Sequence, residues 1–336
     1  MKELILPRAL KRAYTRDSLM TFDNRTIDSA GAFLVGELER LDQKLHEPLA
    51  SVTWSRDIDL RSDVSIADEV SSFTNSSFAA AGGNSPNGKA WVGKDQNAIT
   101  GLSLDIGKTA NPLTLWGMQI GWTIPELESA QRLGRPVDQQ KFAGMNLKYQ
   151  MDVDEQVYIG DSSIGVQGLV NNSLVAATNA PNGASSSPLW SSKTPDEILK
   201  DINTLLNNAW LASGYAVCPG RLLLPPTQFG LLVTKTVSSA GNISLLEYVK
   251  VNCLANTING RPLEVYPLKW LPGRGTGATD RAVAYTKEED RVRFPLTPLQ
   301  RTPLEYRDIR QLTTYFGRLG VVEVVYPECM AYLDGI

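Results

Sequence analysis

Histidine is almost missing from this chain of 336 residues, whose single imidazole belongs to His46. A Ser-His-Asp relay could use only that residue, and a metal site with two histidines is impossible within one chain. The glycine-rich run at residues 273–277 lacks the GK[ST] that would complete a phosphate-binding loop, so we interpret it as a surface loop. Asp152, Asp154 and Glu155 share one predicted helix, and we interpret them as its solvated face. We therefore predict no catalytic residue, no metal and no cofactor, and hence no enzyme.

Cysteine is scarce as well, with three thiols that are far apart and form no CxxC pair: Cys218, Cys253 and Cys329. This pattern predicts buried, reduced thiols in an intracellular protein. No apolar run approaches the roughly eighteen residues of a membrane span, and the N-terminal MKELILPRALKRAYTRD lacks the features of a secretory signal. The net charge of −3 is too small to indicate affinity for nucleic acid or for a membrane.

A long helix is the strongest positive signal, and we predict it over residues 137–158, just after Pro136. Apolar residues recur there at intervals of three and four, which is typical of a helix with one buried face. That stripe consists of Phe142, Met145, Tyr149, Val153 and Val157. A turn-rich run with Gly160 and Gly165 follows, so the helix is predicted to end there.

The N-terminal region reads as a basic segment followed by a helix. Residues 1–25 carry six basic and three acidic side chains and little periodicity, which predicts an arm that becomes ordered on a partner. A second amphipathic helix is predicted over residues 27–45, and Pro48 ends it.

Residues 51–123 favour extended strands. The run SVTWSRDIDLRSDV predicts a strand with charged residues exposed at alternating positions. Two further strand-like runs flank a tip rich in Gly, Asn and Ser that contains Asn87-Gly88, a hairpin-turn signal. Two long strands with a polar tip bury little by themselves, so we expect this hairpin to lie on another molecule. The aromatic residues near the tip support that expectation, because exposed apolar side chains there would otherwise be a liability. They are Phe73, Phe78 and Trp91.

The remaining residues predict a compact α+β region followed by strands. A helix with a good cap opens at Thr194-Pro195, then come the apolar strand in CPGRLLLPP and a helix in PTQFGLLVTK. A third helix is predicted over residues 244–255, and Asn259-Gly260 reads as a hairpin turn. From residue 304 the chain reads as long strands around Gly317 and Gly320, with the valines at 321–325 in a strand buried on both faces.

The order of these elements resembles the major capsid protein of tailed bacteriophages, which has the Hong Kong 97-type fold. Four stretches carry the resemblance, and it spans nearly the whole chain: SAGAFLVGELERLDQKLHEPL, WSRDIDL, DVDEQVYIGDSSIGVQGLVNN and TTYFGRLGVVEVVYPECMAYLDGI. The resemblance implies an α+β fold with an N-terminal arm, an extended β-hairpin loop, a peripheral domain with a long spine helix, and an axial domain. The implied boundaries are 1–26 for the arm, 27–50 for a helix joining the peripheral domain, 51–122 for the extended loop, 123–193 for the peripheral domain with its spine helix at 137–158, 194–303 for the axial domain and 304–336 for closing strands of the peripheral domain.

The resemblance also implies what the chain does. It would be a coat protein that assembles into the hexamers and pentamers of an icosahedral head around double-stranded DNA, made in the host cytoplasm and present in the virion. Expected partners are copies of itself, separate scaffolding and portal proteins, a decoration protein, and DNA through non-specific contacts. The first predicted helix begins near residue 27, so no scaffolding segment is expected within the chain. The side chains assigned to contacts between subunits are Arg12, Arg16, Arg56, Phe73, Phe78, Lys89, Trp91 and Lys94.

Some members of the family join subunits through a Lys–Asn isopeptide bond. Lys89 and Lys94 lie at suitable places in the loop, but no asparagine follows Asn259, so no such bond is expected. Three other classes stay open: an encapsulin-like compartment with the same fold, a tail or baseplate protein, and a hydrolase or transferase that would depend on His46.

Overall fold

A computed structural model describes residues 50–80, 102–133, 137–238 and 241–336. The chain divides into two compact units, residues 1–49 and 50–336, and every described residue belongs to the second. The basic segment, the helix predicted over 27–45 and His46 therefore lie outside the described residues, as does the hairpin tip at 81–101.

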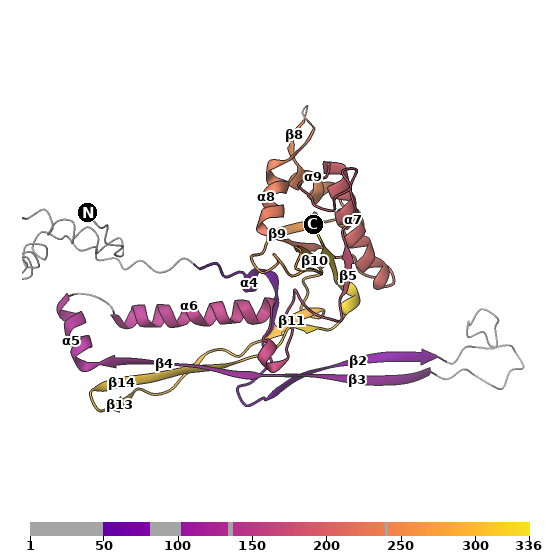
Figure 1. Ribbon diagram of the computed structural model, residues 1–336. Helices are drawn as coiled ribbons and strands as arrows, with labels where there is room; N and C mark the ends of the chain where they lie inside the picture. Colours follow the sequence, from indigo (N-terminus) through magenta and orange to yellow (C-terminus); the bar gives the residue numbers. More distant parts are fainter. Residues whose placement is uncertain (1–49, 81–101, 134–136, 239–240) are drawn as a thin grey trace, which may run out of the picture. The chain divides into compact units, whose positions relative to one another are not determined.

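Helices and strands are both numerous in the described unit (Figure 1). The helices are α4 (Trp54–Asp57), α5 (Ile124–Leu133), α6 (Val137–Tyr158), α7 (Pro195–Ala212), α8 (Pro226–Thr234), α9 (Leu245–Asn252) and α10 (Leu254–Asn259), with 3-10 turns at Ser162–Ile164 and Pro327–Cys329. The strands are β1 (Asp59–Arg61), β2 (Val70–Ala80), β3 (Leu102–Pro112), β4 (Thr114–Thr123), β5 (Ala176–Asn179), β6 (Arg221–Leu224), β7 (Thr236–Ser238), β8 (Gly241–Ser244), β9 (Glu264–Pro267), β10 (Arg281–Tyr285), β11 (Val292–Pro295), β12 (Gln300–Arg301), β13 (Glu305–Arg307), β14 (Arg310–Leu319), β15 (Glu323–Val324) and β16 (Ala331–Asp334).

The long helix is confirmed as α6, with the predicted bounds. Four of the five stripe residues are buried, from Met145 to Val157. Phe142 is the exception, because 47% of it is exposed and its ring lies 5.5 Å from that of Tyr315 on β14. Gly160 ends the helix with a positive φ of 74°, and its N–H donates to the carbonyls of the preceding turn.

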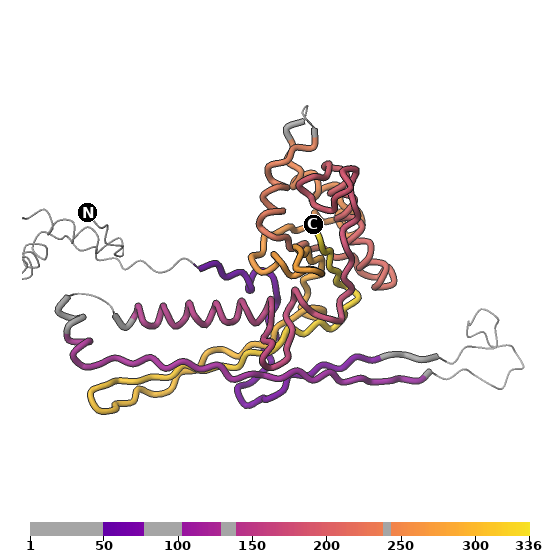
Figure 2. The backbone as a smooth tube through the Cα atoms, viewed as in Figure 1, coloured from indigo at the N-terminus to yellow at the C-terminus, as the bar shows by residue number. Residues whose placement is uncertain are grey.

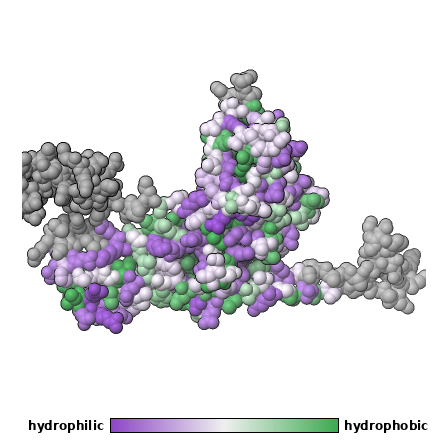
Figure 3. Space-filling model, in the orientation of Figure 1, coloured by the Kyte–Doolittle hydropathy of each residue, from purple (hydrophilic) through white to green (hydrophobic). Residues whose placement is uncertain are grey.

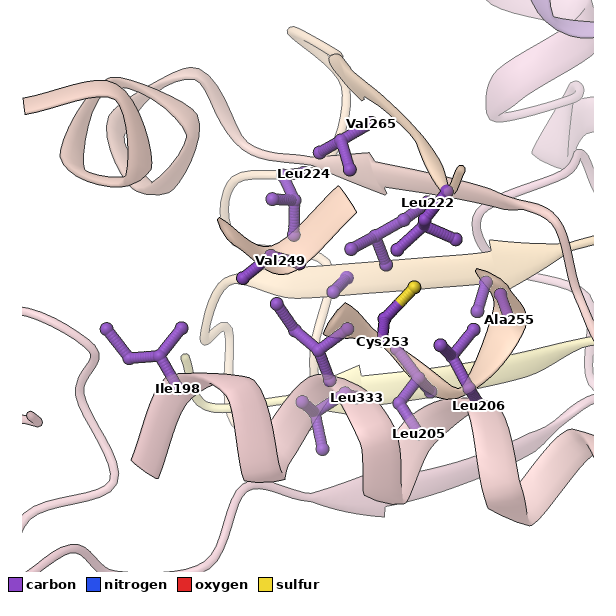
Figure 4. Close-up of a cluster of buried hydrophobic side chains, with 14 of the residues drawn as sticks. Ile198, Leu205, Leu206, Leu222, Leu224, Val249, Cys253, Ala255, Val265 and Leu333 are labelled. Carbon is purple, nitrogen blue, oxygen red and sulfur yellow. The ribbon is translucent and has the colours of Figure 1, made fainter. Parts of the chain in front are cut away.

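A five-stranded sheet in the order β5-β16-β10-β6-β9 separates two hydrophobic cores. Alternate side chains of a strand point to opposite faces. On β6, Leu222 and Leu224 join the core formed with α7 and α9, whereas Leu223 joins the core formed with α6. Figure 4 shows the first of these cores, where Leu205 and Leu206 of α7 face the sheet. Both faces of the sheet are therefore covered, which explains why β6 is continuously apolar.

A second, elongated sheet contains β4 and β14. These strands pair antiparallel over ten residues, from Arg310 opposite Thr123 to Leu319 opposite Thr114. Helix α6 packs against β4, and the two run side by side in Figures 1 and 2. Range 51–122 was predicted as one extended loop, yet its last strand belongs to this sheet, so the hairpin itself ends at Pro112.

The helices after residue 194 are largely as predicted. Helix α7 begins with a capping box in which Thr194 and Glu197 exchange hydrogen bonds, and its predicted apolar face is buried. The helix expected over 244–255 is divided at Cys253 into α9 and α10. Asn259-Gly260 is not a hairpin turn: Gly260 has φ 66° and caps α10, and β9 then pairs parallel with β6. A helix C-cap and a type I′ turn both need a left-handed residue, so the dipeptide alone could not separate them.

Two further predictions are wrong in part. Within the strand predicted from residue 51, Trp54–Asp57 form the short helix α4 before β1, and Asp57 is buried rather than exposed. The valine-rich run at 321–325 contributes only the two-residue strand β15, because β14 stops at Leu319. Gly320 follows it against Pro295, where a Cβ would lie 2.6 Å from the proline ring. The run also contains a buried carboxylate, Glu323.

Candidate inter-subunit surfaces

The hairpin formed by β2 and β3 exposes a long, continuous stretch of strand. The two strands pair along their full length, from Val70 opposite Pro112 to Ala80 opposite Leu102. Within the described residues neither strand pairs with any other. Residues 103–110 of β3 are all exposed, and they include Leu104 (53%) and Ile106 (62%), which lie on one face. Apolar side chains on a free strand pair are typical of a surface that another molecule covers.

The root of this hairpin is fixed by a buried carboxylate, Glu323 of β15. Arg293 of β11 donates to it at 2.7 Å and Arg61 of β1 at 3.2 Å. Ser71 at the start of β2 donates to the same carboxylate. One buried charge thus joins β1, β2, β11 and β15, with two arginines and a hydroxyl satisfying its oxygens.

Arg318 of β14 holds the other side of the root. Its guanidinium donates to the carbonyl of Ile66 at 2.7 Å and to that of Leu113 at 3.1 Å. Leu113 in turn donates its N–H to the carbonyl of Glu69 at 2.9 Å. Side chains from β15 and β14 therefore anchor the base of the hairpin, while the exposed part of β3 has no such support.

Two more buried aspartates join the start of the described chain to the rest of the unit. Asp154 is fully buried and accepts hydrogen bonds from the N–H groups of Thr53 and Trp54 and from the indole of Trp270. The prediction that Asp154 belongs to a solvated face is therefore wrong. The sequence signal for the burial of Asp154 is its position on the helix, directly after the buried Val153.

Asp57 lies in a second buried cluster with two tyrosines. The hydroxyl of Tyr158 on α6 donates to its carboxylate, and the hydroxyl of Tyr285 on β10 donates to its backbone carbonyl at 2.6 Å. Burial and the neighbouring Asp57 charge raise the pKa of both tyrosines well above the ordinary value, so both hydroxyls stay protonated donors. Arg56 adds a bidentate contact at 2.7 Å and lies over the ring of Tyr266. These groups fix geometry within one chain and offer no free nucleophile.

The structure separates the predicted contact residues into three groups. Arg56 contacts its own chain, as above, and its role between subunits stays a prediction. Phe73 is half-buried near the hairpin root, opposite Thr109, and Phe78 lies farther along β2, opposite Leu104. The other predicted contact residues lie outside the described residues: Arg12, Arg16, Lys89, Trp91 and Lys94.

Large apolar side chains are also exposed on other elements, and two groups of them are considered as contact candidates. Tyr306 and Ile309 lie beside the turn between β13 and β14, where Asp308 has a positive φ of 54°. Val233, Ile243 and Val251 lie on α8, β8 and α9. Sequence patterns did not single these residues out for two different reasons. Ile309 stands alone among polar residues, whereas Val233 directly follows two leucines and therefore looks like a core position. In Figure 3 apolar and polar residues are interspersed on the visible face, without one dominant patch.

Side chains that could bind a metal ion are not gathered at one place in the described part of the chain. It contains no group of three or more His, Cys, Asp or Glu side chains that could hold a metal ion. The three cysteines are buried and free, as predicted, and burial raises the pKa of Cys218 to about 11. Among the described residues, no helix combines the length and apolar character needed to cross a membrane.

Comparisons with known proteins agree with this arrangement. A search of curated proteins found no match. Among solved structures, the capsid of Myoviridae phage XM1 superimposes with a TM-score of 0.71 at 17% identity, covering 90% of this chain and 98% of that one. The capsid of a native GTA particle gives 0.59 at 11% identity, covering 93% and 98%. The SrpI encapsulin of Synechococcus elongatus PCC 7942 gives 0.50 at 15% identity, covering 90% and 95%.

These likenesses establish the fold as the Hong Kong 97 type found in tailed-phage capsids. The model of one protein family, described as major capsid protein, matches residues 88–336. That match covers well over half of the sequence, so the chain belongs to the major capsid protein family.

Proposed function

We propose that this protein is the coat subunit of a tailed-phage head and assembles with copies of itself into hexamers and pentamers of an icosahedral shell. The β2–β3 hairpin is the observation that carries the proposal. Side chains of β14 and β15 anchor its root, its two strands pair with no other strand in the part of the chain that the structure describes, and it exposes Leu104 and Ile106. Burying such a side chain on a neighbour contributes up to about 1.5–3 kcal/mol, and every copy in a shell would repeat that gain.

The predicted domain roles fit this proposal with one adjustment. The extended loop, 51–122, would act through its hairpin at 70–112, whereas β4 would serve the peripheral domain of 123–193 and 304–336. The axial domain, 194–303, would meet its copies through exposed residues such as Val233, Ile243 and Val251. The arm, 1–26, and the helix region, 27–50, would contact neighbouring subunits. The side chains listed from the sequence, Arg12 to Lys94, remain the candidates for these contacts.

The shell would enclose double-stranded DNA through non-specific contacts. We further propose that separate scaffolding, portal and decoration proteins act with it, and that the shell assembles in the host cytoplasm and becomes part of the virion. The absence of asparagine after Asn259 supports a shell without Lys–Asn bonds between subunits.

Particle formation tests the proposal directly. The full chain is expressed alone and with its neighbouring phage genes, and then examined by gel filtration and electron microscopy. Closed icosahedral particles are expected. A subunit that stays monomeric or dimeric at high concentration under both conditions would contradict the proposal.

An encapsulin-like compartment is the second candidate, because an encapsulin is among the structural neighbours. The contents of the purified particles distinguish the two functions. Packaged double-stranded DNA supports the phage head, and a co-purifying enzyme without DNA supports the compartment.

A further inference from the structure

A pocket of about 310 Å³ lies where three segments from different parts of the described chain meet. One segment joins α7 to β6 and ends at Arg221, the second joins α10 to β9, and the third joins β10 to β11. The apolar side chains that line the pocket are small: Ala216, Val217, Cys218 and Pro262. A site for an organic ligand normally offers a larger apolar lining, so this pocket suits a small charged species.

Positive charge predominates among the side chains that line the pocket. Four basic side chains stand against two carboxylates, a net charge of +2 (4 − 2). The basic residues are Arg221, Arg261, Lys287 and Arg291, and the acidic ones are Glu264 and Glu288. A pocket lined mainly by cations raises the local concentration of anions.

The two carboxylates are already engaged by neighbouring arginines. Arg221 donates from Nε to Glu264 at 2.9 Å. Arg291 likewise donates to Glu288. Arg261 is exposed, and no ion pair involves it within the described residues. Its guanidinium is therefore available to an incoming anion.

Lys287 is oriented by groups that do not line the pocket. Its ammonium donates to the carbonyl oxygen of Arg56 at 2.9 Å and lies 3.3 Å from the carboxylate of Asp59. An ammonium has three N–H donors, and these contacts use at most two of them. The third can serve an anion in the pocket.

Thr286 also lines the pocket, and its hydroxyl supplies an independent observation. The Oγ1 atom is buried and has no hydrogen-bond partner among the described residues. A buried hydroxyl without a partner costs free energy, so such groups are normally paired. An oxygen of a bound anion would accept this hydrogen bond.

We propose that the pocket binds a phosphate group, with Arg261, Lys287 and Thr286 as its donors. A phosphate carries several acceptor oxygens around one atom, so it can accept from a guanidinium, an ammonium and a hydroxyl at the same time. The donors come from two segments that are distant in the sequence. Only the folded chain therefore forms the site, and the bound anion stabilises that fold. The inference goes beyond shell formation and does not depend on it.

Thermal unfolding of the full chain tests the inference, with inorganic phosphate as the probe and sodium chloride at the same ionic strength as the reference. At about five times its Kd, phosphate should raise Tm by about 2–3 °C. A short oligothymidylate distinguishes the sources of the phosphate group. A shift with inorganic phosphate indicates the free anion, and a shift with the oligonucleotide alone indicates the backbone of a nucleic acid. No shift with either, or an equal shift with chloride, would overturn the inference.

Thr286→Val makes the test specific to the pocket. Valine keeps the shape of threonine without the hydroxyl, so in the absence of phosphate this variant should be at least as stable as the wild type. Its affinity for phosphate, measured by isothermal titration calorimetry, should be about tenfold lower. An unchanged affinity contradicts the proposed site.

Two arginine variants provide a matched pair for the same titration. Arg261→Ala should weaken phosphate binding about tenfold, because a charge-assisted hydrogen bond is lost. Arg310→Ala, at an exposed arginine of β14 that does not line the pocket, should leave the affinity unchanged. Equal losses in the two variants would mean that phosphate binds through general surface charge and not in this pocket.

Discussion

Glu323 lies between valines in the run VVEVV, and its carboxylate is fully buried against Arg61, Arg293 and Ser71. A buried acid of this kind contributes less to stability than its contacts suggest, because burial costs solvation. Its removal is nevertheless expensive, because two guanidinium groups then lose their common partner.

Replacing Glu323 by alanine should lower the free energy of unfolding by about 3 kcal/mol, because both arginines lose their common partner. The loss should not be larger, because both arginines reach some solvent and can relax in part. The measurement is urea unfolding of the unassembled subunit, followed by tryptophan fluorescence. Glu305→Ala, at an exposed position of β13, serves as the matched control and should change the value by less than about 0.5 kcal/mol. Similar values for the two variants would show that the carboxylate does not hold the hairpin root.

Asp334 gives the fold a dependence on acid. Burial by itself would raise the pKa of this carboxyl, but hydrogen bonds from Arg281 at 2.6 Å and from the N–H of Thr276 at 2.9 Å outweigh burial and lower the pKa below its ordinary 3.8. A folded-state pKa below the unfolded value stabilises the protein at higher pH, and this contribution disappears as pH falls through the folded value. The loss is therefore expected below about pH 4.

Asp334→Asn should be less stable than the wild type at pH 6, and the difference should shrink between about pH 4 and pH 2. Urea midpoints measured across that range test this. Asp308→Asn, at an exposed turn residue that asparagine also suits, is the control. Parallel pH profiles for wild type and Asp334→Asn would contradict the assignment.

At the scale of elements, two glycines with nearly the same backbone differ in their surroundings. Gly160 and Gly165 have φ of 74° and 70°. A Cβ at Gly160 would lie 2.5 Å from the carbonyl oxygen of Val166, whereas nothing lies within 4 Å of one at Gly165. Gly165→Ala should therefore cost about 1 kcal/mol from backbone strain alone, and Gly160→Ala at least twice as much. Chemical denaturation of both variants measures the difference in their free energies of unfolding. Equal losses would mean that the turn after α6 can shift to make room for a Cβ at Gly160.

The hairpin can be shortened without disturbing its root. Replacing residues 76–106 by Asn-Gly joins Asn75 to Gly107, which face each other across the two strands. The variant should keep its urea midpoint, because the contacts of Glu323 and Arg318 remain, yet form no closed particles by electron microscopy. Efficient particle formation would show that the distal hairpin is dispensable for assembly.

At the scale of the whole molecule, hydrophobic periodicity predicted the helices and strands whose buried faces follow from their own sequence. It located α6 and α7 with most of their buried apolar residues, and CPGRLLLPP indicated the short apolar strand β6. It failed where distant partners decide the outcome. Asp154 and Glu323 are buried only because groups about 100 and 250 residues away neutralise or bond them. Likewise, the backbone conformation at Asn259-Gly260 depends on the parallel pairing of β9 with β6, which no local sequence pattern indicates. The proposed contact surfaces could be predicted only as exposed segments, because their partners would belong to other molecules.

The free edges of β2 and β3 matter also in the interval between synthesis and assembly. Bare strand edges can stack on one another into fibrous aggregates. Here Asp105 and Lys108 interrupt β3, and serine, threonine and asparagine occupy most of β2. Like-charged neighbours repel each other in a stack, and polar side chains pack poorly in a dry interface, so these residues act as gatekeepers. Their substitution by valine should therefore shift newly made protein towards insoluble material before any shell can form.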